Sequence, residues 1–143
     1  MLNLLLPVDG SESATRATHK LIASLPWYKE PPRIDVVAVH LPVHKFPNMS
    51  LVISTEMLDR YYSEECAEML APSRRVLDQA GVAYTAHPLV GSIAETIIAQ
   101  SKRLDSTMIY MGTRGMTALS NMLLGSVTTR VLHLAEIPIV LVH

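Results

Sequence analysis

This chain has little of the material from which disulfide scaffolds, zinc sites and aromatic clusters are built. Its 143 residues include one cysteine, one tryptophan and one phenylalanine. A single cysteine, Cys66, excludes an internal disulfide and favours a reducing compartment. Cys66 lies in a helical pattern without a nearby histidine or second cysteine, so we expect it to be buried and inert. No pair of the six histidines has the spacing of zinc ligands, and a structural metal site is not expected.

An excess of charge of one sign is also missing. Lysine and arginine together number 12 and aspartate and glutamate 13, for a net charge of -1, and the chain contains no basic block. This balance does not point to nucleic acid as a partner. No apolar run reaches membrane-spanning length, and the short apolar start, which Asp9 ends, lacks the basic residues of a signal peptide. We therefore expect a soluble, cytoplasmic protein with neither nucleic-acid nor membrane partners.

Short apolar runs alternate with helical patterns along the whole chain. Hydrophobic residues make up 49% of it and charged residues 17%, which is enough for the core of one domain over residues 1–143. The apolar runs predict strands at residues 4–8, 34–39, 82–89, 108–111 and 138–142. Helical patterns cover residues 11–25 and 55–80, and two more begin at Ser92 and near Ser126.

Prolines and a capping motif mark particular positions in these elements. Pro7 is unusual in a central strand because it cannot donate a hydrogen bond to the ladder. Pro72 lies inside the long helical pattern and should kink or interrupt it. Ser92 and Glu95 have the spacing of a capping box. Methionine and tyrosine side chains at helical spacing are expected in the core or at an interface, and these are Met57, Tyr61, Tyr62 and Met69.

Strands that are apolar on both faces and separated by helices predict a parallel sheet covered by helices on two sides. Ligands of such sheets bind at the carboxyl ends of strands, where the strand order reverses. Two candidate site segments follow strand ends, residues 8–11 after the first strand and residues 111–112 after the fourth. If both belong to one site, the first and fourth strands are neighbours, which favours the order 3-2-1-4-5.

A glycine pattern follows the fourth predicted strand and precedes a helix. Gly112, Gly115, Gly125 and Ser126 form the sequence G-x-x-G-x9-G-S. Glycines let backbone N–H groups approach an anion closely, and a helix start offers unpaired donors and the positive end of the helix dipole. The pattern therefore predicts a phosphate-binding loop, with plain turn and cap glycines as the alternative. A side chain at Gly115 would obstruct the ligand or require a disallowed backbone angle.

Two polar residues beside this loop have two interpretations each. Asp9 follows the first strand, where it either caps the next helix or contacts a ligand. Ser126 caps the last helix, binds phosphate, or does both. Val39, at the end of the second strand, is expected in the core or in a pocket wall.

These segments resemble the universal stress protein family along essentially the whole chain. The resemblance rests on residues 8–11, 70–81 and 91–97, on the closing apolar strand, and on G-x-x-G-x9-G-S, which is typical of the family's nucleotide-binding branch. It implies a Rossmann-like α/β fold of the nucleotide-binding α-hydrolase type. It also implies a homodimer formed through the last strand, which begins at Pro138 and ends at Val142.

The resemblance further implies adenine-nucleotide binding. In the ATP-binding branch, the residue matching Asp9 lies against the adenosine, the residue matching Val39 contacts the base, and the glycine loop and the residue matching Ser126 hold ribose and phosphates. The complete set of expected nucleotide-binding residues is Pro7, Val8, Asp9, Val39, Met111, Gly112, Arg114, Gly115, Gly125, Ser126, Val127 and Thr128.

One departure from the family pattern concerns charge. Many relatives carry arginine or lysine ahead of the aliphatic pair that precedes the third glycine, where this chain has Ser120, Asn121 and Met122. Charge compensation for a triphosphate then falls mainly on Arg114, Arg130 or a divalent ion.

The sequence thus predicts a cytoplasmic stress-response protein that binds ATP, ADP or AMP, with or without Mg²⁺, as a sensor for an unidentified protein partner. No residue set provides an evident general base beside an activated nucleophile, which favours a sensor over a fast enzyme. Two alternatives stay open. One is a slow ATPase or a phosphoryl or nucleotidyl transferase that uses Asp9 and bound Mg²⁺. The other is a dimeric interaction protein whose loop binds no nucleotide.

Overall fold

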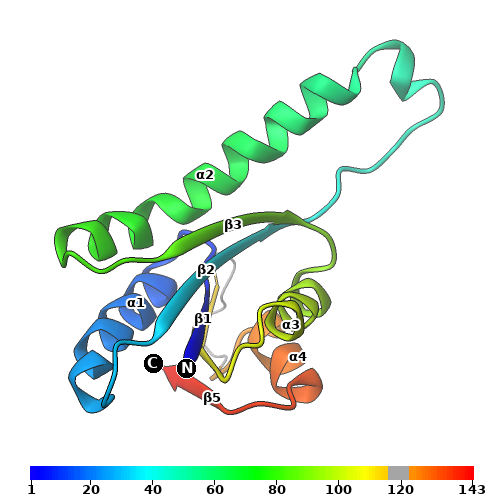
Figure 1. The fold of residues 1–143 in the computed structure, drawn as a ribbon. Coiled ribbons are helices and arrows are strands. Elements are labelled where there is room, and N and C mark those ends of the chain that lie inside the picture. The colour runs from blue at the N-terminus through cyan, green and yellow to red at the C-terminus, as the bar shows by residue number, and fades with distance from the viewer. Residues whose placement is uncertain (116–122) are drawn as a thin grey trace.

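A computed structural model of the chain describes residues 1–115 and 123–143. Five parallel strands form one sheet in the order β3-β2-β1-β4-β5, which confirms the predicted strand order (Figure 1). The strands are β1 (Asn3–Pro7), β2 (Arg33–His40), β3 (Thr85–Val90), β4 (Met108–Gly112) and β5 (Ile139–Val142). The helices are α1 (Glu12–Ser24), α2 (Thr55–Gln79), α3 (Ile93–Arg103) and α4 (Ser126–Leu134), with short 3₁₀ turns at Leu25–Trp27 and Met49–Leu51.

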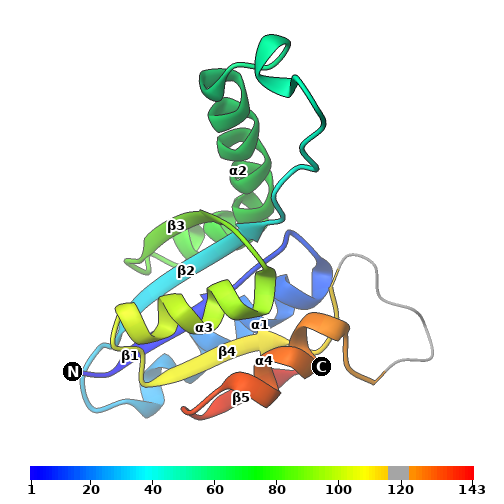
Figure 2. The ribbon, with the colours of Figure 1, turned by 90° about the vertical axis from the view of Figure 1, so that its right-hand side faces the viewer.

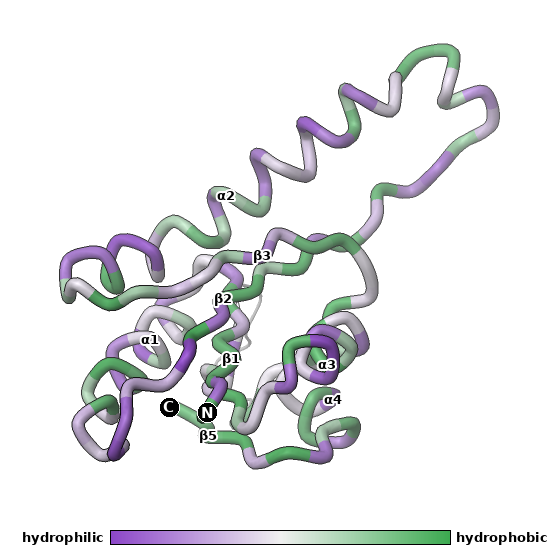
Figure 3. Tube along the Cα trace, in the orientation of Figure 1, coloured by the Kyte–Doolittle hydropathy of each residue, from purple (hydrophilic) through white to green (hydrophobic). Residues whose placement is uncertain are grey.

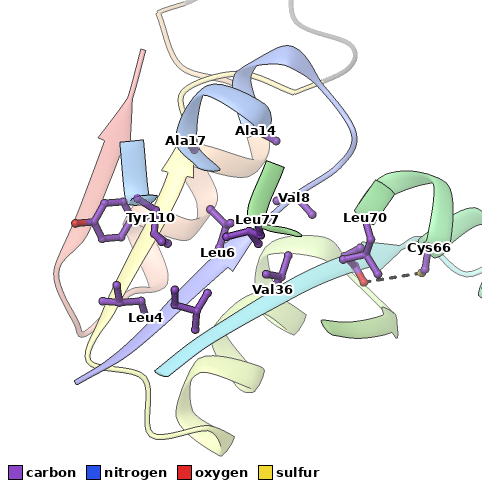
Figure 4. Packing of buried hydrophobic residues seen from close by; sticks show 13 residues of the cluster. Leu4, Leu6, Val8, Ala14, Ala17, Val36, Cys66, Leu70, Leu77 and Tyr110 are labelled. Carbon is purple, nitrogen blue, oxygen red and sulfur yellow. Dashed lines mark hydrogen bonds between the residues drawn. The ribbon is translucent and has the colours of Figure 1, made fainter. Parts of the chain in front are cut away.

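Alternate residues of the central strands supply two separate cores. Leu4 and Leu6 of β1 pack with side chains of α1 and α2, and Figure 4 shows this first core. Leu5 lies on the opposite face, in a second core with side chains of α3 and α4. Figure 2 shows α3 and α4 in front of the sheet. Because successive side chains of a strand point to opposite faces, an almost continuous apolar run fits a sheet that helices cover on both sides.

Serine side chains cap the N-termini of two helices, and the capping box expected at a third is not formed. Ser11 caps α1 by accepting a hydrogen bond from the backbone N–H of Ala14 at 3.1 Å, and Ser54 caps α2 in the same way. Ser92 precedes α3, but its side chain makes no capping hydrogen bond. Glu95 instead accepts a hydrogen bond from Arg130 Nε of α4 at 2.9 Å. The predicted capping box is therefore wrong, because a charged partner on another helix competes with the local cap.

Of the two effects expected at Pro72, a kink or an interruption, the interruption is wrong. α2 continues through Pro72 from Thr55 to Gln79. Leu70 and Leu77, on either side of the proline, are buried in the core beneath the helix, and Ser73 Oγ lies 2.8 Å from Thr18 Oγ1 of α1. Tertiary packing on both sides thus holds the helix together where the proline removes one backbone hydrogen bond.

The N-terminal half of α2, together with residues 41–54, extends beyond the sheet (Figure 1). Met57 and Tyr61 in this half are 57% and 41% exposed, so they lie outside the core, and an interface position stays a prediction for these two residues. Tyr62 is half-buried, and its hydroxyl accepts a hydrogen bond from the backbone N–H of Val43. Met69 packs against the first core, as expected. Figure 3 shows apolar and polar residues intermixed along the projecting part.

Cys66 is buried, as expected, with 1% of its surface exposed. Its thiol donates to the backbone oxygens of Ala38 and Leu89, and burial raises the pKa of the thiol. A raised pKa disfavours the reactive thiolate. Within residues 1–115 and 123–143, every helix is too short or too polar to span a lipid bilayer.

Candidate functional site

The candidate site begins where β1 and β4 separate. β1 pairs with β4 only at Leu4 and Leu5, whereas it pairs with β2 as far as Pro7. The N–H of Val8 donates to Val37 of β2, so alternation along the strand turns the Pro7 nitrogen toward the β4 side. The β1–β4 ladder has already ended there. Pro7 is therefore tolerated in a central strand. β1 and β4 are no longer paired at this point, near the carboxyl ends of the strands, which is where ligands of parallel sheets bind.

The turn after β1 holds the Asp9 carboxylate in place. Asp9 Oδ1 accepts a hydrogen bond from the backbone N–H of Ser11 at 3.0 Å, and Ser11 rather than Asp9 caps α1. Gly10 between them has a φ of +85°, a conformation that glycine adopts without strain. Of the two interpretations of Asp9, helix capping is therefore excluded.

The first glycine of the pattern is required by packing. A Cβ added at Gly112 would lie 2.2 Å from Ser13 Oγ and 2.7 Å from the Ser13 carbonyl oxygen, so α1 packs directly on the backbone of β4. Ser13 Oγ also accepts a hydrogen bond from the backbone N–H of Arg114 at 3.2 Å. Ser13 is the site residue that the sequence analysis missed. Its only signal in the sequence was a small polar residue in the first turn of the helix after Asp9.

The second glycine lies against Asp9. A Cβ added at Gly115 would come 2.8 Å from Asp9 Oδ2, so the absence of a side chain brings the loop and the carboxylate together. The φ of Gly115 is not positive, and the predicted need for a disallowed backbone angle is wrong. The close approach to Asp9 explains why glycine stands here.

The third glycine connects this loop to α4. The backbone N–H of Gly125 donates to the carbonyl of Thr113, and a Cβ added at Gly125 would lie 3.4 Å from Arg114 Cα and 3.5 Å from the nitrogen of Gly115. Residues 113–115 therefore lie directly against the N-terminus of α4. The four N-terminal N–H groups of a helix have no partner within the helix, so these donors border the loop.

The start of α4 differs from the prediction in one detail. Gly125 is the N-cap residue and Ser126 is the first helical residue, so Ser126 does not cap the helix. The Ser126 side chain is exposed. Thr128 is 3% exposed and donates its hydroxyl to the Gly112 carbonyl at 3.0 Å, which fastens α4 to the end of β4.

The remaining expected residues form the apolar surroundings of the site. Val39 and Met111 are buried in the core beneath α3 and α4, where Val127 is partly buried against them. Pro7 and Val8 are buried at the end of β1. The structure thus brings Asp9, residues 113–115 and the start of α4 together, with these apolar residues around the strand ends.

The two arginines near the loop, Arg114 and Arg130, differ in their hydrogen-bond partners. Arg130 Nε donates to Glu95 Oε1 at 2.9 Å, and this hydrogen bond lowers the pKa of the Glu95 carboxyl. Arg114 Nε is buried and has no hydrogen-bond partner among the described residues. Ser120, Asn121 and Met122, where many relatives are expected to carry a cation, lie outside the described residues.

These features agree with a family comparison. The model of the universal stress protein family matches residues 1–143. The chain belongs to this family. The universal stress protein MJ0531 of Methanocaldococcus jannaschii is 30% identical to it over 140 residues, which are 97% of this chain and 80% of the relative.

Solved structures of universal stress proteins share the fold. UspA from Lactobacillus plantarum has a TM-score of 0.82 at 18% identity, over 99% of this chain and 97% of that one. A universal stress protein in complex with cAMP has a TM-score of 0.69, also at 18% identity, over 99% of this chain and 97% of that one. At these identities the comparison establishes the five-stranded α/β fold of this universal stress protein.

Proposed function

We propose that this universal stress protein binds ATP or another adenine nucleotide and acts as a sensor in a cytoplasmic stress response. The observation that carries the proposal is the close approach of Gly115 to the Asp9 carboxylate, which leaves no room for a Cβ, beside the N-terminus of α4. One end of this arrangement offers an anchored acceptor for the nucleoside, and the other offers backbone donors for phosphate. The cAMP complex of a structurally similar universal stress protein supports the choice of an adenine nucleotide.

Each part of the site has a role in this proposal. Asp9 accepts a hydrogen bond from the adenosine, and Val39, near the end of β2, contacts the base. The backbone N–H groups in the first turn of α4, with the Ser126 hydroxyl, donate to the phosphates. When ATP binds with Mg²⁺, its phosphates hold the ion.

The Asp9→Asn variant tests the nucleoside contact. Asparagine keeps one oxygen for the Ser11 N–H, which Asp9 Oδ1 now accepts at 3.0 Å, so the turn should be preserved. The other carboxylate oxygen becomes a donor. We expect affinities for adenosine and AMP to fall by similar factors, about tenfold, as for the loss of one hydrogen bond to a charged group. Isothermal titration calorimetry measures both, and a loss confined to AMP would instead assign Asp9 to the phosphate end.

We also propose a homodimer formed through β5. β5 is the last strand of the sheet order, and Leu141 on it is 37% exposed. An open aliphatic edge invites pairing with another strand, and pairing with a second copy across a two-fold axis closes it.

Leu141→Lys is expected to shift this dimer toward monomer, because lysine places a charge in the paired edge. Light scattering at tens of micromolar, roughly the range in which a standard-size interface associates, should show a wild-type dimer and a largely monomeric variant. Met57→Lys is the matched control, since Met57 is exposed on the projecting half of α2. A monomeric wild type would contradict the proposed assembly.

A further inference from the structure

The charges available to a bound phosphate are few. From Met108 at the start of β4 to Leu134 at the end of α4, the sequence contains two arginines, Arg114 and Arg130, and no lysine. Residues 116–122, whose structure is not described, carry no charged side chain in the sequence. The loop and its helix can therefore offer a ligand at most these two guanidinium groups.

Arg130 is already engaged. Its Nε donates to Glu95 Oε1 at 2.9 Å, and both side chains are about half exposed on neighbouring helices, at 55% and 50%. The pair is neutral as a unit. A phosphate that recruited Arg130 would have to separate it from Glu95 and then face an unpaired carboxylate.

Arg114 is placed differently. Its backbone N–H donates to Ser13 Oγ, and its Cα lies against Gly125 at the N-terminus of α4. Its Nε is buried without a hydrogen-bond partner among the described residues. Burial of an unpaired guanidinium nitrogen is unfavourable, and an anionic oxygen at this position would satisfy it. Arginine donors match phosphate oxygens in geometry as well as charge.

The charge balance then limits the ligand. One guanidinium and the positive end of α4, equivalent to about half a charge, suit a single phosphate group. Each further phosphate adds negative charge, and residues 108–134 contain no further arginine or lysine to balance it.

We infer that the site selects an adenine nucleoside monophosphate over the triphosphate when no divalent ion is present, with Arg114 as its cationic phosphate contact. This inference rests on the proposed function, because it assumes that the site holds an adenine nucleotide. It assigns a role in ligand specificity to Arg114. It also predicts that Mg²⁺ raises the affinity for ATP and not for AMP, because the ion balances the additional phosphate charge.

Calorimetric titration with adenosine, AMP and ATP in EDTA tests the inference. For the wild type we expect AMP to bind about tenfold or more tightly than ATP. Arg114→Met should weaken AMP binding about tenfold or more and leave adenosine binding unchanged, since it removes a charge-assisted hydrogen bond to phosphate. Arg114→Lys should retain part of the AMP affinity. Arg130→Met should weaken AMP binding less than Arg114→Met does.

The control is Arg103→Met, which removes the same charge from an exposed position in the last turn of α3. It should leave all three affinities unchanged, and thermal unfolding should show every variant folded. ATP binding as tightly as AMP in EDTA, or an Arg114→Met variant with undiminished AMP affinity, would overturn the inference and leave the proposed function intact. A wild type that binds neither adenosine nor any nucleotide would overturn both.

Discussion

Replacing Gly115 with valine is expected to abolish most nucleotide binding while the protein stays folded. The new Cβ would come 2.8 Å from Asp9 Oδ2, and the branched side chain would stand between the carboxylate and the start of α4. We expect the Kd for AMP to rise roughly 100-fold, the equivalent of two hydrogen bonds to charged groups at about 1.5 kcal/mol each.

Stability should change less in this variant than in Gly112→Ala, because the described atom that the Cβ would meet is a side-chain oxygen and not backbone. Calorimetry measures the affinity for AMP, and urea unfolding measures the stability. Gly115→Ala, with a smaller side chain, should lower the affinity by an intermediate amount. If folded Gly115→Val bound AMP as tightly as the wild type, the loop would be a structural turn and the proposed function would fail.

Gly112→Ala is expected to have the largest effect on stability. The alanine Cβ would lie 2.2 Å from Ser13 Oγ, and 2.7 and 2.8 Å from the oxygen and carbon of the Ser13 carbonyl. A backbone group cannot rotate away as a side chain does, so α1 must shift from β4. We expect a loss of about 3 kcal/mol in the free energy of unfolding, near the upper end for overpacked cores.

Two variants make this prediction specific. Gly115→Ala introduces the same methyl group three residues later and should cost less than about 1 kcal/mol, because the described atom that it meets is a carboxylate oxygen and not backbone. Adding Ser13→Ala to Gly112→Ala should not restore stability, because the Ser13 carbonyl remains in place. Urea unfolding of the set measures each difference, and equal losses at Gly112 and Gly115 would contradict direct packing of α1 on β4.

The two glycines show how far the sequence could predict the site. The spacing of Gly112, Gly115 and Gly125 predicted where β4 ends and where α4 begins, and the structure confirms these two positions. It did not distinguish the glycine needed by helix packing from the one that approaches Asp9, because that difference depends on which atoms of α1 and β1 lie opposite. Ser13 was missed for the same reason.

Local signals failed where distant groups compete with them. Ser92 and Glu95 match a capping box, yet Glu95 pairs with Arg130 of α4. Pro72 should disturb a helix, yet buried contacts at Leu70 and Leu77 hold α2 together through it. The partner in each case lies far away in the chain, so no short window of sequence contains it.

By itself, the sequence determined the class of the fold, because apolar runs and helical patterns reflect burial on two faces of a parallel sheet. It also determined the strand order, once two candidate site segments were assigned to neighbouring strand ends. Only the tertiary structure decided what each site residue contacts: Asp9 with the Ser11 N–H, Gly115 with Asp9, and Arg130 with Glu95. The hydrophobic periodicity that indicates a strand or a helix is set by residues close together in the sequence. These contacts instead join residues of different elements, whose distances and directions are set only when the elements pack together.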